Sequence, residues 1–217
     1  VERLGADIKV LTGDLSEPEC PAKLVNDALK AFGGLDAVVS NAGITSPAPL
    51  IDLPVSKWDK LLNVNTRATL LLAQAAHSAL KDSKGALVAV ASMSGMGAHP
   101  GMGAYGPSKA ALISLCQVLA QEWACDGINV NTVSPGMIRT PLTQKVYENN
   151  QIARERAALV PWGRVGNPED ISNAISFLLS PEADYITGQN ILIDGGFVGS
   201  LYSHIPGLPD SSEIDKT

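Results

Sequence analysis

The sequence predicts an α/β fold in which a doubly wound parallel sheet lies between two layers of helices. Five short apolar runs have the length and the Val and Ile content of buried parallel strands, and several end in Gly, Asn, Asp or Ser. Segments with helical patterning lie between these runs, and such alternation favours parallel strands joined by crossover helices. A chain of 217 residues, 45% of them hydrophobic, is long enough for one domain with a sizeable core.

The elements follow one another along the chain in a regular order. The expected strands are 8–12, 35–40, 86–91, 128–133 and 190–193. The expected helices are 22–32, 58–80, 105–125 and 168–179. The last helix opens on Pro168-Glu169-Asp170, and Pro followed by acidic residues is typical of a first helical turn. We expect residues 1–205 to form one domain and the polar residues 206–217 to form a flexible tail.

Composition and charge exclude several classes of protein. The net charge of −6 gives no basic surface for a nucleic acid. No apolar run approaches the roughly 20 residues of a membrane span, and no targeting segment is visible. The three cysteines, Cys20, Cys116 and Cys125, are odd in number and lack metal-ligand spacing. We therefore expect a cytoplasmic protein with reduced thiols, no metal, and neither nucleic acid nor membrane as partner.

Tyr105 and Lys109 form the most informative pair in the chain, and Ser92 precedes them. Residues four apart share one face of a helix, so Lys109 can bring a positive charge near the Tyr105 phenol. A nearby cation lowers the pKa of a phenol from about 10 towards neutrality, which suits it for proton transfer. Taken alone, the pair is more readily explained as an ordinary helix-surface contact.

Further motifs follow the expected strands in a fixed order, most of them where parallel-sheet proteins bind ligands. They are Asp14 in Thr-Gly-Asp-Leu, Asn41-Ala42-Gly43, Asn63-Val64-Asn65, Ser134-Pro135-Gly136 with Thr140, and Asp194-Gly195-Gly196. Together with Ser92, Tyr105 and Lys109, they make the chain resemble the short-chain dehydrogenase/reductases over about residues 1–200. The resemblance is to the branches of 3-oxoacyl-carrier-protein reductase and glucose dehydrogenase, and it implies a Rossmann-type fold.

The resemblance assigns a catalytic role to four residues. Tyr105 would be the general acid in reduction and the general base in oxidation. Lys109 would lower the Tyr105 pKa and hydrogen-bond the nicotinamide ribose. Ser92 would donate a hydrogen bond to the substrate carbonyl, and Asn65 would position a water that relays protons between Lys109 and solvent.

The same resemblance implies NAD or NADP as cofactor. The adenine is expected at the end of the first expected strand, and the adenosine half of the cofactor packs against the turn after the second. The nicotinamide carboxamide is expected at the loop after the fourth expected strand. The residues expected to bind it, besides Tyr105 and Lys109, are Asp14, Leu15, Asn41, Ala42, Gly43, Pro135, Gly136, Ile138 and Thr140. From the residues alone, Asp14 is also a good helix cap, and Asn41-Ala42-Gly43 is also a plain turn.

The substrate is expected to be a small carbonyl compound or secondary alcohol, covered by a mobile lid over residues 142–162. The residues expected to line its pocket are Met93, Ser94 and Met137, with His99, Tyr147 and Trp162 as further candidates. His99 also fits a surface loop, and Ser94 also fits a turn cap. The resemblance further implies a homo-oligomer, a tetramer in many members, with contacts through the helices 58–80 and 105–125.

One family motif is not found in this sequence. The glycine-rich turn Thr-Gly-x-x-x-Gly-x-Gly, which holds the cofactor pyrophosphate, is not present, and Thr12-Gly13 lacks the further glycines. We therefore expect the first two strands of the family's sheet to be missing, which leaves 8–12 without a neighbour.

Two functions stay open at this point. The first is an NAD(P)-dependent oxidoreductase. The second is a non-catalytic binding or assembly module, or an inactive fragment that has lost cofactor binding, and weak cofactor affinity is expected of the chain as given. A serine hydrolase built on Ser92 is disfavoured, because neither His77 nor His99 lies in a catalytic motif and the chain has no Gly-x-Ser-x-Gly elbow.

Overall fold

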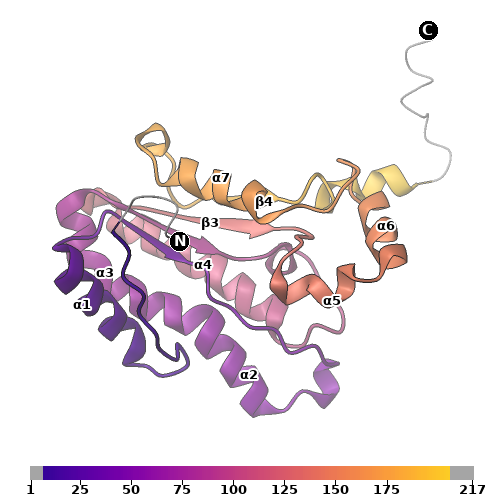
Figure 1. Ribbon diagram of the computed structural model, residues 1–217, viewed down its shortest axis with the longest axis horizontal. Coiled ribbons are helices and arrows are strands. Elements are labelled where there is room, and N and C mark those ends of the chain that lie inside the picture. Colours follow the sequence, from indigo (N-terminus) through magenta and orange to yellow (C-terminus); the bar gives the residue numbers. More distant parts are fainter. Residues whose placement is uncertain (1–6, 206–217) are drawn as a thin grey trace, which may run out of the picture.

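The computed structural model describes residues 7–205, which form a parallel four-stranded sheet with helices on both faces (Figure 1). The strands are β1 (Ala37–Ser40), β2 (Ala86–Val90), β3 (Asn129–Pro135) and β4 (Asn190–Ile193). Their order across the sheet is β1-β2-β3-β4, and every pair is parallel. The α/β fold with a doubly wound parallel sheet is confirmed, with four of the five expected strands at their expected places.

The helices also follow the expected order. They are α1 (Cys20–Phe32), α2 (Val55–Leu62), α3 (Ala68–Ser83), α4 (Tyr105–Trp123), α5 (Gln144–Tyr147), α6 (Asn150–Ala158) and α7 (Pro168–Leu178). The expected helix 58–80 is α2 and α3, joined by a π-helical turn at Asn63–Arg67. α5 and α6 were not expected, and they lie within the segment 142–162.

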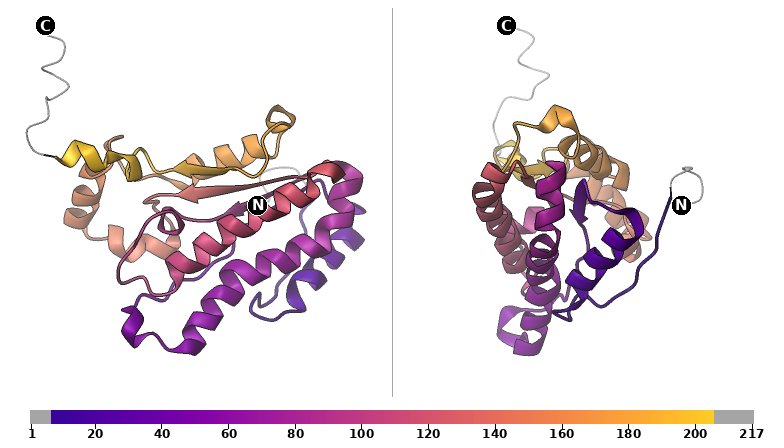
Figure 2. Two further views of the ribbon diagram at one scale, coloured as in Figure 1. Left: turned by 180° about the vertical axis from the view of Figure 1, so that it is seen from behind. Right: turned by 90° about the vertical axis from the view of Figure 1, so that its left-hand side faces the viewer.

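Two apolar clusters hold the layers together. On one face of the sheet, Leu87 and Val130 pack beneath α1, α3 and α4, and Leu80 and Leu112 are among the fully buried side chains there. On the other face, Val88 and Val133 pack against α7. Figure 2 shows the two layers from behind and from the side. Because alternate strand residues face opposite layers, neighbouring residues such as Leu87 and Val88 pack into different clusters.

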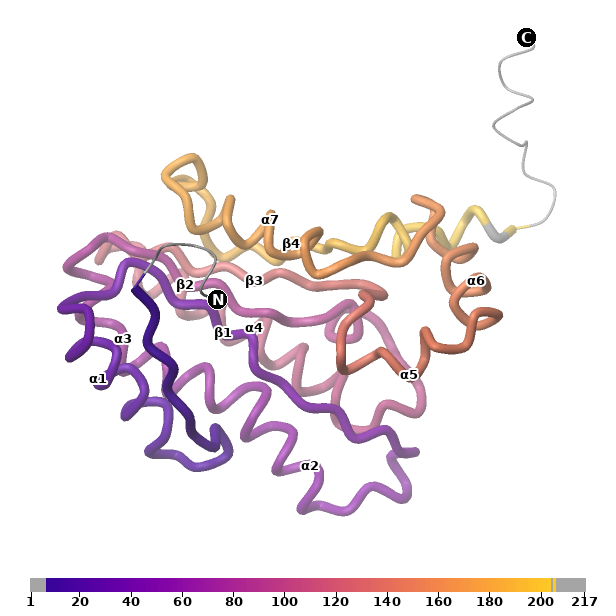
Figure 3. The backbone as a smooth tube through the Cα atoms, viewed as in Figure 1, coloured from indigo at the N-terminus to yellow at the C-terminus, as the bar shows by residue number. Residues whose placement is uncertain are grey.

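The expected strand 8–12 does not form, and this prediction was wrong. These residues are extended but unpaired, and Ile8 and Val10 are 47% and 78% exposed. Figure 3 shows the segment running beside α1, outside the sheet. A strand needs a neighbour to pair its backbone N–H and C=O groups, and within the described residues β1 pairs only with β2. The tail expected at 206–217 lies outside the described residues.

On the side of the sheet that α7 covers, the face of β1 is left uncovered. α7 packs against β2 and β3, whereas Val39 of β1 remains 42% exposed. In the part of the chain that the structure describes, β1 is therefore an edge strand with an apolar side chain left uncovered on this face.

Candidate active site

The strands β1, β2 and β3 are parallel, so their carboxyl ends lie on the same side of the sheet. The expected catalytic residues lie at these carboxyl ends. Ser92 follows β2, while α4 begins at Tyr105 and carries Lys109 one turn further on. Ser92 is 8% exposed, and it lies near enough to Tyr105 to lower the pKa of the phenol. The fold thus brings together residues from a strand end and a helix start, as a ligand site at this edge of an α/β sheet requires.

Lys109 is buried at 3% exposure, although it carries an ammonium group. Its Nζ donates a hydrogen bond to the carbonyl oxygen of Val90 at 2.7 Å. The same Nζ lies 6.0 Å from the centroid of the Tyr105 ring. The helical spacing therefore does place the cation on the face of α4 that carries the phenol.

The electrostatic consequence differs from the expectation. Burial raises the pKa of Tyr105, and the nearby Ser92 side chain offsets this only in part. Burial also lowers the pKa of Lys109 to about 8. The expected lowering of the Tyr105 pKa by Lys109 is not found, because the ammonium is itself desolvated and is directed to the Val90 carbonyl rather than to the phenol oxygen.

Asn65 lies in the π-helical turn and is 1% exposed. Its Oδ1 accepts from the backbone N–H of Ile44 at 2.8 Å, and its Nδ2 donates to the Ile44 carbonyl at 3.0 Å. Nδ2 also donates to Ser108 Oγ at 2.9 Å. The side chain therefore ties the loop after β1 to α4, and π turns are frequent at functional sites.

Ser108 is a positioning residue that the sequence analysis missed. It is fully buried, and its hydroxyl donates to the Tyr105 carbonyl at 2.7 Å while it accepts from Asn65. Thr66 adds a hydrogen bond to the Ser108 carbonyl at 2.8 Å. The available signal was its place directly before Lys109 in the first turn of α4, whereas the π turn itself has no sequence signature.

Gly43 brings the loop after β1 close to this group. A Cβ at this position would lie 3.3 Å from Lys109 Nζ and 3.4 Å from Asn65 Oδ1. Asn41 and Ala42 beside it are exposed. The segment expected to contact the cofactor thus lies next to Lys109, and its small residue leaves the ammonium room.

Asp14, expected at the adenine, is exposed and forms a local turn. Its Oδ1 accepts from the backbone N–H and the hydroxyl of Ser16, at 2.8 and 2.7 Å, and these bonds lower the Asp14 pKa. It does not cap α1, whose N-cap is Glu19. Leu15 beside it is half-buried.

The loop after β3 is shaped by close packing. A Cβ on Gly136 would lie 2.5 Å from the Asp194 Cβ, so only glycine fits beside the end of β4. Pro135, the last residue of β3, is half-buried. Ile138 is buried and bridges to Gly166, and the Thr140 hydroxyl lies 3.2 Å from that of Thr143.

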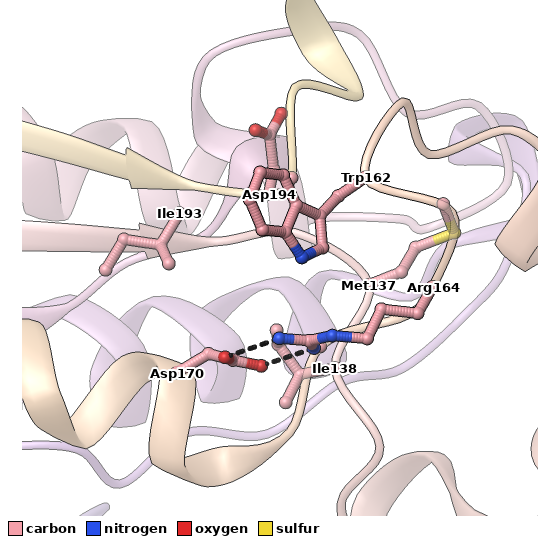
Figure 4. A pocket seen from close by; sticks show the side chains of 9 residues that line it. Met137, Ile138, Trp162, Arg164, Asp170, Ile193 and Asp194 are labelled. Atoms are coloured by element: carbon pink, nitrogen blue, oxygen red, sulfur yellow. Dashed lines mark hydrogen bonds and ion pairs between the residues drawn. The ribbon is translucent and has the colours of Figure 1, made fainter.

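Met137 and Ile138 line a separate pocket with Trp162 (Figure 4). This pocket, of about 230 Å³, lies between the loops after β3 and β4 and the start of α7. Arg164 and Asp170 form two hydrogen bonds across it, at 2.7 and 2.8 Å. Asn65, Ser92, Tyr105 and Lys109 do not line it, and the expected contact of Met137 with substrate remains a prediction.

Met93 and Ser94 lie in the turn directly after Ser92. The Ser94 backbone N–H donates to Ser92 Oγ at 3.1 Å, so the turn holds the Ser92 hydroxyl in place. Ser94 is buried, and its hydroxyl lies 2.7 Å from Nδ1 of His99 on the loop before α4. Ser94 therefore stabilises the turn after Ser92 through these hydrogen bonds. Its expected contact with substrate remains a prediction.

Two general properties bear on the kind of site. Within residues 7–205, no helix is long and apolar enough to cross a membrane. The same residues contain no group of three or more His, Cys, Asp or Glu side chains arranged to hold a metal ion.

Comparisons with known proteins identify the family. A family model described as enoyl-(acyl carrier protein) reductase matches residues 1–198. The 3-oxoacyl-[acyl-carrier-protein] reductase FabG of Thermotoga maritima is 39% identical over 178 residues, which cover 81% of this chain and 71% of that protein. The chain spans about two thirds to three quarters of the length of its curated relatives.

Solved structures agree with this assignment. A short-chain type dehydrogenase/reductase from Mycobacterium marinum is 32% identical with a TM-score of 0.81, and the match covers 89% of this chain and 77% of that one. A 4-hydroxyisoleucine dehydrogenase complexed with NADH is 33% identical with a TM-score of 0.83, covering 91% and 83%. The chain therefore belongs to the short-chain dehydrogenase/reductase family.

Proposed function

We propose that this protein is an NAD- or NADP-dependent oxidoreductase that interconverts a small carbonyl compound and the corresponding secondary alcohol. The observation that carries the proposal is the convergence of Ser92, Tyr105 and Lys109 at the carboxyl edge of the sheet. The names of the relatives, which are reductases and dehydrogenases, point to the same reaction class.

Tyr105 is the proton-transfer group in this proposal. In reduction its phenol donates a proton to the carbonyl oxygen as negative charge develops there, and in oxidation its phenolate takes the proton from the alcohol. Ser92 lies near enough to Tyr105 to lower the pKa of the phenol, so both hydroxyls can serve one substrate oxygen. Ser92 then stabilises the developing charge at that oxygen.

The residues on this side of the site fit a nicotinamide cofactor. The ammonium of Lys109 lies beside Gly43, and a Cβ there would come within 3.3 Å of it. Lys109 would hold the ribose hydroxyls, and Pro135, Gly136 and Thr140 would face the carboxamide. A bound cofactor supplies or accepts the hydride, and the chain's own residues orient the substrate and move the proton.

We also propose that the protein is cytoplasmic and assembles into homotetramers. Apolar surface on the long helices supports the assembly, since Val118 of α4 is 52% exposed and a shallow pocket lined by Leu62, Leu70 and Leu115 lies between α4 and the α2–α3 helix. Light scattering coupled to gel filtration measures the mass directly, and a monomer would refute the assembly.

The proposal is tested by titrating the purified chain with NADH and with NADPH, followed by a screen of ketones. Tyr105→Phe removes only the phenol oxygen, so we expect cofactor binding to persist while kcat falls by about 10²- to 10⁴-fold. Tyr185→Phe is the matched control, because Tyr185 is fully exposed and should leave kcat unchanged. Equal turnover by wild type and Tyr105→Phe would refute the role of Tyr105, and failure to bind either cofactor would favour the non-catalytic module.

A further inference from the structure

Two arginines and a tyrosine gather in the segment after β3, and none of them belongs to the group around Tyr105. The guanidinium carbon of Arg139 lies 5.3 Å from the centroid of the Tyr147 ring. That of Arg156, from α6, lies 5.7 Å from the same centroid. We call these three residues the Arg–Tyr cluster.

Within the described residues, the polar groups of this cluster have no hydrogen-bond acceptor or anionic side chain as a partner. Tyr147 is 5% exposed, and its buried hydroxyl makes no hydrogen bond. In the described part of the chain, neither guanidinium forms a side-chain hydrogen bond or an ion pair, whereas both terminal nitrogens of Arg164 bond to Asp170. The Tyr147 ring attracts both guanidinium groups through cation–π contacts, and their N–H donors and the Tyr147 hydroxyl are not used in side-chain hydrogen bonds within the described residues.

The cluster lies at the edge of the sheet where the proposed reaction takes place. Arg139 comes from the loop after β3, and Figure 1 shows α5 and α6 beyond the carboxyl ends of β3 and β4. Ser92 follows β2 at the same edge. Ligands of open α/β sheets bind outside the carboxyl ends of the strands, so a molecule at Tyr105 can extend towards this cluster.

Resting on the proposed function, we propose that the Arg–Tyr cluster binds an anionic oxygen group of the substrate, a carboxylate or a phosphate. Guanidinium groups donate paired hydrogen bonds to such groups, and the Tyr147 hydroxyl adds a third donor. The substrate class is then a ketone or secondary alcohol that carries this anionic group away from the reacting carbon. The cluster sets specificity and takes no part in proton transfer.

Anion binding is tested first, without cofactor and without turnover. The thermal unfolding midpoint of the full chain is measured against malonate, inorganic phosphate and neutral malonamide, with sodium chloride matching the ionic strength. A ligand that binds the folded state raises the midpoint with concentration. We expect a saturable rise with malonate, phosphate or both, which tells carboxylate from phosphate, and no rise with malonamide. The same response to malonate and to sodium chloride would overturn the proposal.

Variants then locate the bound anion. Arg139→Gln with Arg156→Gln should abolish the rise, and Tyr147→Phe should weaken it. Arg154→Gln is the matched control, since Arg154 is an exposed arginine of the same helix and should leave the rise intact. Arg139→Gln alone changes an exposed side chain, so it retains the fold if the double variant does not. A rise that survives in Arg139→Gln and in the double variant would refute the site.

A kinetic measurement separates this inference from the proposed function. 4-Oxopentanoate and its methyl ester present the same ketone, with and without the negative charge. We expect at least a tenfold higher kcat/KM for the acid, lost in the double variant and kept in Arg154→Gln. Reduction of both compounds at equal kcat/KM would refute the cluster's role and leave the proposed function standing. Anion binding without reduction of any ketone would refute the proposed function and retain the anion site.

Discussion

Lys109 carries a charge in a place that disfavours charge. Its side chain is 3% exposed, and burial lowers its pKa from 10.5 to about 8. Below pH 8 the folded protein must hold a desolvated ammonium, which one hydrogen bond to Val90 compensates only in part. The residue therefore weakens the fold in the form that the proposed reaction uses.

We predict that Lys109→Met stabilises the protein and abolishes turnover. Because the Lys109 pKa is lower in the folded than in the unfolded state, the unfolded state binds more protons between about pH 8 and 10.5. Wild-type stability should therefore rise with pH across this window, and the variant should lack that rise. At pH 7 the variant should gain roughly 1–3 kcal/mol in unfolding free energy.

Urea unfolding at several pH values measures both effects. Lys23→Met, at an exposed position of α1, is the control and should keep the wild-type pH dependence. Parallel pH profiles for wild type and Lys109→Met would contradict the explanation based on burial.

At the same scale, the sequence located the catalytic candidates but not their electrostatics. The spacing of Tyr105 and Lys109 on α4 placed both side chains on one face of the helix, and the structure agrees. The direction of the Tyr105 pKa shift could not be predicted, because it depends on burial and on the nearness of Ser92. Both come from β2 and α4 packing together, which helical spacing alone does not reveal.

The π-helical turn between α2 and α3 is the element that organises the site. It rotates Asn65 inward, where the amide holds the loop after β1 through Ile44 and holds α4 through Ser108. All three bonds are buried or partly buried, so their loss leaves polar groups without water.

We predict that Asn65→Ala lowers the unfolding free energy by roughly 1–3 kcal/mol, because Ile44 and Ser108 lose their partners. The loop that carries Gly43 should loosen as well, so hydrogen exchange at residues 41–44 should accelerate. Asn63→Ala, in the same turn but without side-chain hydrogen bonds, is the control for both measurements. Equal losses in the two variants would show that the turn, and not the Asn65 amide, is responsible.

Element boundaries were predictable where local signals were strong. Pro168 and the acidic residues after it mark the start of α7, and Asp170 accepts from the Asn167 N–H at 2.7 Å as a first-turn acid should. α5 and α6 were missed, because short helices of mixed composition have little periodicity and are stabilised by their surroundings.

At the scale of the whole molecule, the edge strand β1 is the part of the sheet most open to pairing with another copy. Val39 is 42% exposed, and the extended residues Ile8 and Val10 do not cover it. An open edge strand presents unpaired backbone groups beside apolar side chains, which promotes pairing with another copy.

We predict that Val39→Lys reduces self-association of the 217-residue chain, because charge on an edge strand disfavours edge-to-edge pairing. Dynamic light scattering over a concentration series should show smaller particles than for wild type. Val55→Lys introduces the same charge at an exposed position of α2 and should not change association. If both variants act alike, net charge rather than the strand edge controls association.

The sequence by itself determined the α/β class, the order of the elements and the identity of the catalytic candidates. The class and the order follow from apolar periodicity, a local property of the chain, and the catalytic candidates follow from the family resemblance that the ordered motifs carry. The tertiary structure decided which of these elements persist and what surrounds each charge. Residues 8–12 have the composition of a strand but no strand beside them, so they remain unpaired. The burial of Lys109, the π turn at Asn65 and the convergence of Arg139 and Arg156 on Tyr147 arise from contacts between distant segments, which no local pattern encodes.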